Sequence, residues 1–241
     1  FPGPNGAPSI RNIYIGILLA AVAQPASFSA AELEFISQFI ADCAPPIDLL
    51  ESPPPESGGI FWIDLDKDFP GHALIRRIPT PDARVLYFSC AAIAEITLKQ
   101  RSAILQGVSA QTLGLPPFAD GATGPNTLLR LNRLWGHPSK RRFSRRRQSY
   151  RANICSGLNN LWHLMKSQQV PSNQSEWMVT NESPDGYSLM HMTGQTQDLH
   201  VGDIVALQAL GDHSELATTW HVCIVRWAVS ENPEHIELGL Q

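Results

Sequence analysis

The second half of the chain consists of short apolar segments that turn residues interrupt at close intervals. From Arg151 onward, segments such as EWMVTNE, GYSLMHM and DIVALQAL are rich in β-branched and aromatic residues, and Gly, Asn, Asp or Pro separates them. Segments of this length and spacing are typical of antiparallel strands and leave no room for the crossover helices of a parallel sheet. The pattern therefore predicts a small antiparallel barrel or sandwich. One segment, GLNNLWHLM at 157–165, suits a helix as well as a bent strand.

The first half mixes helical and strand-like segments. A helix is predicted for SFSAAELEFISQFIADC, because Ser29 and Glu32 have the spacing of a capping box and apolar residues follow at helical spacing. GIFWIDL and RVLYFSC are strand-like, and two further helical segments precede Gly136. We therefore expect an α+β protein with a mixed helix and strand domain at 1–136 and a β domain at 137–241.

The apolar run IYIGILLAAVA at 13–23 is too short to cross a membrane, which takes about eighteen or more apolar residues in succession. The preceding APSIRN carries one positive charge, so a buried helix or strand is favoured over the core of a signal peptide. Four cysteines lie at long and unequal intervals, which favours reduced thiols. We expect a cytoplasmic protein without membrane insertion.

The sequence lacks the motifs of common enzyme and metal sites. It contains no GxSxG, GxxxxGK[ST] or GxGxxG, and its spacing pairs no two carboxylates for general acid and base work. CxxC and HExxH are also absent, so no zinc site is preformed in the sequence. We expect a protein that is not an enzyme, has no catalytic residues and uses neither a metal nor a cofactor. An enzyme of unrecognised type stays open as an alternative.

Positive charge is concentrated in one segment of an otherwise acidic chain. KRRFSRRRQSYR at 140–151 holds seven of the eighteen Lys and Arg residues, which leaves eleven against twenty-two Asp and Glu elsewhere. Such a local cluster indicates one anionic partner at one place rather than a broad surface for polyanions. Arg side chains bind phosphate through paired N–H donors and grip the O6 and N7 edge of guanine. A solvated basic linker into the β domain is the alternative explanation.

A second candidate feature is the stretch NESPDGY at 181–187. Asn181 has an amide able to pair with a base edge, Ser183 has a hydroxyl, and Gly186 lets the backbone approach a ligand without a Cβ. The same residue types make ordinary turns. Taken alone, the stretch favours a turn.

Taken together in their order, these features resemble the PilZ domain over residues 140–241. An RxxxR, a [DN]xSxxG about thirty residues later, and then VGDIVAL, VCIVRW and IELGLQ follow one another. The resemblance implies a six-stranded antiparallel β-barrel that binds the bacterial second messenger cyclic di-GMP. It assigns the first motif to Arg147 and Arg151, which adjoin the first strand, and the second to NESPDGY, whose Asn replaces the more usual Asp.

The ligand-binding residues implied by the resemblance are Arg146, Arg147, Arg151, Asn181, Ser183 and Gly186. In the family, the arginines hold phosphates and guanine edges, and the [DN]xSxxG residues contact a guanine from the barrel face. The dense arginine run also allows RxxxR at 141 and 145 or at 142 and 146, and Arg146 is expected to add a contact to the preferred pair.

We therefore expect a cytoplasmic bacterial cyclic di-GMP receptor in which a mobile arginine segment closes over the ligand and changes the interdomain arrangement or partner binding. The first domain is expected to be regulatory and to bind a protein partner. A PilZ-like adaptor that no longer binds nucleotide is one alternative. A nucleic-acid binder that uses KRRFSRRR as a basic arm is another, and the acidic remainder of the chain disfavours it.

Overall fold

The chain divides into two units in a computed structural model. The structure describes residues 9–55, 58–140, 142–167, 174–194, 196, 199–210, 219–232 and 235–241. The first unit comprises residues 1–25 and 30–140, and the second comprises 26–29 and 141–241. The main division therefore falls at residues 140 and 141, whereas the sequence placed the boundary near residue 136.

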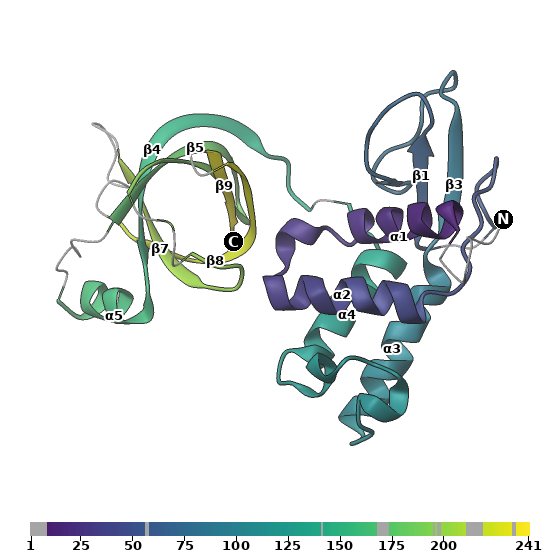
Figure 1. Ribbon diagram of the computed structural model, residues 1–241. Helices are drawn as coiled ribbons and strands as arrows, with labels where there is room; N and C mark the ends of the chain where they lie inside the picture. The colour runs from purple at the N-terminus through teal and green to yellow at the C-terminus, as the bar shows by residue number, and fades with distance from the viewer. Residues whose placement is uncertain are drawn as a thin grey trace. The chain divides into compact units, whose positions relative to one another are not determined.

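The first unit contains four α-helices and a small antiparallel sheet among the described residues (Figure 1). Its helices are α1 (Ile10–Val22), α2 (Ala30–Cys43), α3 (Ala91–Leu105) and α4 (Gly124–Gly136). Its strands, in the order β2-β1-β3, are β1 (Ile60–Asp64), β2 (His72–Ala73) and β3 (Val85–Ser89). Short 3-10 helices lie at Gln111–Leu113 and Pro117–Asp120, and a third, Pro25–Ser27, runs from the first unit into residues 26–29 of the second. The apolar run at 13–23 thus falls almost entirely within α1.

The core of the first unit forms around Trp135 of α4. This side chain is fully buried, stacks on Phe39 of α2 with ring centroids 6.0 Å apart, and donates its indole N–H to the carbonyl of Leu19 in α1 at 3.1 Å. One residue therefore ties three helices together. Glu32, which the sequence placed in a capping box, accepts hydrogen bonds from Thr127 and Arg130 of α4.

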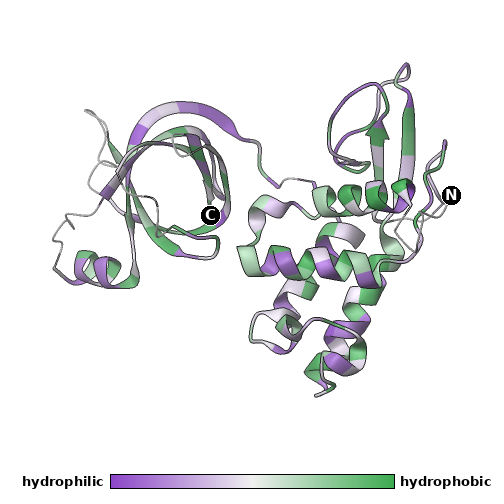
Figure 2. Ribbon diagram, viewed as in Figure 1, coloured by the Kyte–Doolittle hydropathy of each residue, from purple (hydrophilic) through white to green (hydrophobic). Residues whose placement is uncertain are grey.

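An apolar groove of about 820 Å³ runs between α1 and α2. Ile13 and Ile17 of α1 and Leu33 of α2 line it and remain partly exposed, and Arg11 and Asp48 form an ion pair of 2.6 Å beside it. Figure 2 shows that α1 is predominantly hydrophobic. Among the residues that the structure describes, no helix combines the length and the apolar character needed to span a membrane.

The second unit is an antiparallel sheet of six strands (Figure 1). These are β4 (Arg146–Ser156), β5 (Gln174–Ser183), β6 (Gly186–Thr193), β7 (Ile204–Leu210), β8 (His221–Asn232) and β9 (His235–Leu240). They pair in the order β4-β5-β6-β9-β8-β7, and β7 pairs back with β4, which closes the sheet into a barrel. The expected α+β class and the six-stranded antiparallel sheet are confirmed.

The interior of the barrel is filled by alternate residues of all six strands. Trp177 and Val179 of β5 are fully buried there, together with residues such as Ile154, Leu189 and Leu238 from neighbouring strands. Side chains of successive strand residues point to opposite faces, so the residues between these positions face outward. This alternation determines which side chains can form a site on the outer surface.

Two features of the second unit differ from or refine the sequence expectations. The ambiguous segment at 157–165 is helical and belongs to α5 (Leu158–Ser167), which packs Leu161 and Leu164 against the outward-facing Cys155 of β4. The arginine run is not a linker throughout, because β4 begins at Arg146 and pairs with β5 from that residue onward. The start of β4 is accordingly a hydrophilic strand (Figure 2).

The four cysteines are free thiols with unequal burial, and we expect unequal reactivity. Cys90, Cys155 and Cys223 are buried, Cys43 is only partly so, and burial raises the pKa of all four thiols. Because alkylation requires an accessible thiolate, iodoacetamide should label Cys43 first in the native chain, and the other three only after unfolding. Peptide mass spectrometry after timed labelling measures this order. Equal rates at Cys43 and Cys155 would contradict the described packing.

Candidate functional site

The end of the β5–β6 hairpin presents polar residues to the outside of the barrel. Val179 faces inward opposite Leu189, but a β-bulge follows, and Asn181 pairs with Ser188 on the outer face. Ser183 pairs with Gly186 at the end of the hairpin and donates its hydroxyl to the Gly186 carbonyl at 3.3 Å. The stretch NESPDGY therefore comprises the end of β5, a turn and the start of β6, which agrees with the turn that its residue types predict.

A second bulge, between β8 and β9, turns two consecutive side chains outward. Val225 and Ala228 both pack into the barrel interior, so Arg226 and Trp227 between them face the outside. The register confirms the irregularity, because Val225 pairs with Leu240 whereas Trp227 pairs with Gly239. β-Bulges often re-aim side chains at binding sites in this way.

Trp227 lies across the backbone of Gly239. A Cβ added at Gly239 would coincide with the indole Nε1, Cδ1 and Cε2 atoms of Trp227, so any residue other than glycine would displace the ring. Gly239 faces outward because Leu238 and Leu240 on either side of it are buried inside the barrel. The indole therefore packs with one face against the Gly239 backbone.

The segment just before β4 lies beside these residues. The guanidinium of Arg142 stacks over the ring of Phe143, with its central carbon 5.2 Å from the ring centroid. Arg145 donates a hydrogen bond of 3.4 Å to the hydroxyl of Ser188, which is on the outer face of β6. Arg145 is thereby anchored next to the β5–β6 hairpin.

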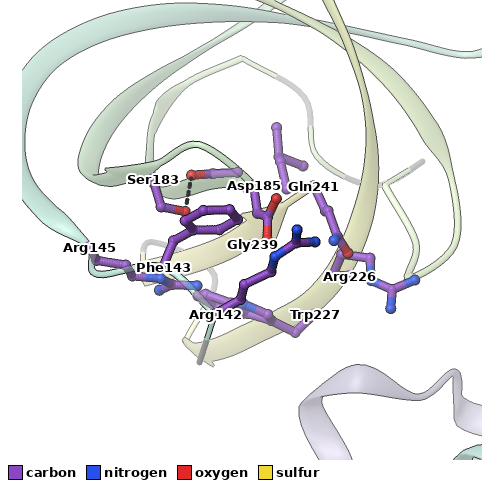
Figure 3. A pocket seen from close by; sticks show the side chains of 11 residues that line it. Arg142, Phe143, Arg145, Ser183, Asp185, Arg226, Trp227, Gly239 and Gln241 are labelled. Carbon is purple, nitrogen blue, oxygen red and sulfur yellow. Dashed lines mark hydrogen bonds between the residues drawn. The ribbon is translucent and has the colours of Figure 1, made fainter. Parts of the chain in front are cut away.

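These elements surround a pocket of about 200 Å³ on the outer face of the barrel (Figure 3). The lining combines three arginines, one carboxylate and two aromatic rings, a net charge of +2 from its Arg and Asp side chains. The lining residues are Arg142, Phe143, Arg145, Ser183, Asp185, Gly186, Arg226, Trp227, Gly239, Leu240 and Gln241. Such a set can bind an anion through charge-assisted hydrogen bonds while an aromatic surface holds a planar group.

The structure brings some of the residues proposed from the sequence into this pocket. Ser183 and Gly186 line it. Asn181 faces the same outer surface, but its amide lies 3.5 Å from the Thr180 hydroxyl and it does not line the pocket. Arg147 is directly opposite Asn181 in the β4–β5 register, so the two share a face outside the pocket lining.

The other two proposed arginines lie elsewhere on β4. Arg151 forms an ion pair of 3.1 Å with Glu176 of β5, and Arg146 is opposite Glu182 at the start of the strand. The pocket instead takes two of its three arginines from positions 142 and 145, before the strand, and the third, Arg226, from β8. Arg142 belongs to the alternative RxxxR at 142 and 146, and Arg145 belongs to the one at 141 and 145. Arg141 itself lies outside the described residues.

Sequence reasoning missed Asp185, Arg226 and Trp227. Asp185 lies inside the motif and could have been included as a nearby carboxylate. Trp227 and Arg226 occur in VCIVRW, which read as an ordinary strand, and only the bulge opposite Gly239 reveals that both face outward.

On the inward side, Glu182 of the hairpin pairs with a tyrosine of the neighbouring strand β4. Tyr150 donates its hydroxyl to Glu182 at 3.2 Å, and Tyr187 packs nearby against the interior cluster. Burial, reinforced by the Glu182 charge, raises the pKa of both phenols. The two phenols therefore stay neutral.

Among the residues that the structure describes, no three His, Cys, Asp or Glu side chains gather as a metal ion would require. No family model matches the chain, and no curated protein matches it. What the pocket binds is therefore inferred from its geometry and chemistry.

Proposed function

We propose that the outer-face pocket of the second unit binds a cyclic dinucleotide, cyclic di-GMP, and that the protein is a non-catalytic bacterial receptor for it in the cytoplasm. The observation that carries this proposal is the convergence of Arg142, Arg145 and Arg226 with Ser183 of the hairpin on one pocket. A net charge of +2 suits a ligand with two phosphates. The resemblance of the motif order to the PilZ domain supports the same ligand.

The proposed roles follow from the chemistry of each group. Arg142 and Arg145 hold phosphate oxygens, because the guanidinium fork matches their geometry. The Ser183 hydroxyl donates to the backbone and keeps its acceptor lone pairs for a base donor. Gly186 lines the pocket, and its missing Cβ lets the Leu240 carbonyl of β9 lie directly against the hairpin. At about 200 Å³ the pocket is smaller than sites that enclose a whole ligand, about 300–1,000 Å³, so part of the dinucleotide lies on the barrel surface.

Ligand binding would also transmit a signal through the connection between the two units. Arg142 and Arg145 directly follow the division between the two units in the chain, so ordering this segment around a ligand would act on their connection. The ligand can shift the interdomain arrangement only if it binds one arrangement more tightly than another. The expected protein partner of the first unit is likewise a proposal, supported by the partly exposed Ile13, Ile17 and Leu33 of its groove.

The experiment that tests the function compares two arginines by calorimetric titration of the full chain with cyclic di-GMP. Arg145→Ala should weaken binding about 10- to 150-fold, as expected for loss of a charge-assisted hydrogen bond of about 1.5–3 kcal/mol. Arg151→Ala removes the same charge from a side chain that pairs with Glu176, and should change Kd less than about threefold. The pair separates a specific contact from a general loss of positive charge.

The outcomes discriminate between the alternatives. No heat with folded wild-type chain would overturn ligand binding and favour the adaptor. A loss confined to Arg151→Ala would restore the register preferred from sequence, with Arg147 and Arg151 as the ligand pair. Tighter binding to single-stranded or duplex DNA than to cyclic di-GMP, with a steep salt dependence, would favour the basic-arm alternative.

A further inference from the structure

The pocket contains two groups that phosphate binding does not explain. Asp185 is an exposed carboxylate among three arginines, and Trp227 is an indole held flat on Gly239. A carboxylate beside a dianionic ligand is unfavourable unless the ligand offers it hydrogen-bond donors. An aromatic ring seated in a pocket of this size offers a stacking surface for one planar group.

We propose that this pocket selects guanine over adenine, with Asp185 reading the base edge and Trp227 stacking on the base. The inference rests on the proposed function and names the specificity of that same site. The volume of about 200 Å³ admits a single base rather than the whole dinucleotide. The phosphates then lie towards Arg142 and Arg145, before the first strand of the barrel.

Asp185 discriminates guanine from adenine through the hydrogen-bond donors on the edge of the base. Guanine carries two adjacent donors, N1–H and the N2 amino group, which match the two oxygens of one carboxylate. Adenine has an acceptor at N1 and no amino group at C2, so the same carboxylate would face a lone pair. Arg226 of β8 also lines the pocket, and its guanidinium would add to the selection, because a guanidinium pairs with the O6 and N7 acceptors of guanine and meets a donor at N6 of adenine.

Trp227 contributes affinity without reading the base. Its ring is covered on one side by the Gly239 backbone, and Trp227 also lines the pocket, so a base entering the pocket meets the indole surface. Stacking of this kind tolerates any base because every base has a π face. The two residues therefore have separable effects, one on the preference between ligands and the other on overall affinity.

The test measures Kd for cyclic di-GMP, cyclic di-IMP and cyclic di-AMP with the full chain. The wild-type chain should bind them in that order of decreasing affinity, because inosine lacks only the N2 amino group. Asp185→Ala should weaken cyclic di-GMP at least about tenfold and reduce its preference over cyclic di-AMP by a similar factor, leaving only the part of the preference that Arg226 contributes. All three ligands carry the same two charges, so the ratio of Kd values cancels the general effect of removing a negative charge.

Trp227→Ala should weaken all three ligands by a similar factor, about 5- to 150-fold, and leave their order intact. Gly239→Ala keeps the indole but displaces it, and should reproduce the loss; the double variant should lose no more than either single one. Wild-type binding of cyclic di-GMP with an unchanged ratio in Asp185→Ala would overturn the inference and leave the proposed function standing. A wild-type chain that binds none of the ligands overturns both.

Discussion

Gly186→Ala is expected to destabilise the second unit by about 3–5 kcal/mol and to abolish ligand binding at the pocket. A Cβ at this position would collide with the carbonyl oxygen of Leu240 and lie 2.9 Å from its carbonyl carbon. Both contacts are to backbone, so no side-chain rotation relieves them. Tyr187 pairs with Leu240 one residue further on, which means that relief must come from separating β6 from β9.

The matched control for this variant is Gly202→Ala. Gly202 also has a positive φ, 98°, but an added Cβ would meet no atom within 4 Å. Its substitution should cost only the backbone strain, about 1–2 kcal/mol. Hydrogen exchange of β4–β9 peptides across a denaturant series gives the unfolding free energy of the second unit alone. Equal losses in the two variants would mean that the close approach of Gly186 to Leu240 does not exist in solution.

Trp135→Ala is expected to cost the first unit about 3–5 kcal/mol or more. The substitution removes a fully buried indole that contacts Phe39 and satisfies the Leu19 carbonyl. It therefore opens a cavity between α1, α2 and α4 and also leaves a buried acceptor without its donor. The same exchange measurement on the helices of the first unit determines the loss.

Trp135→Phe separates the two contributions. Phenylalanine keeps most of the ring packing against Phe39 but has no N–H for the Leu19 carbonyl, which should cost about 1–3 kcal/mol for the lost hydrogen bond and less for the smaller ring. A Phe variant as stable as wild type would show that the hydrogen bond contributes nothing. A Phe variant as unstable as the Ala variant would show that the packing of the ring contributes nothing.

Local patterns were sufficient to predict most elements of the chain. The alternation around Trp177 and Val179 specifies one buried face, and a one-residue slip would put both in water, so strand β5 was readable from its sequence. The helical spacing of the apolar residues in SFSAAELEFISQFIADC predicted α2 for the same reason. The sequence did not predict which other elements these helices and strands contact. Glu32, for example, contacts Thr127 and Arg130 nearly a hundred residues away.

The candidate site was only partly predictable. Ser183 and Gly186 were found because a compact motif carries both. The arginines were placed by adjacency to the first strand, but β4 starts at Arg146, which moves Arg147 and Arg151 into the strand and leaves Arg142 and Arg145 to line the pocket. Where a strand begins depends on the partner that its backbone pairs with, and the arginine run itself gives no sign of that residue.

The sequence by itself determined the class of the protein: the periodicities of 3.6 and 2, the turn residues between short segments and the concentration of arginine are all local properties of the chain. The tertiary structure alone decided which residues share a surface. Two β-bulges, at Asn181 and at Trp227, shift the register of their strands and bring Asn181, Arg226 and Trp227 to the outer face. A bulge is a property of a strand pair, so it exists only once β5 meets β6 and β8 meets β9.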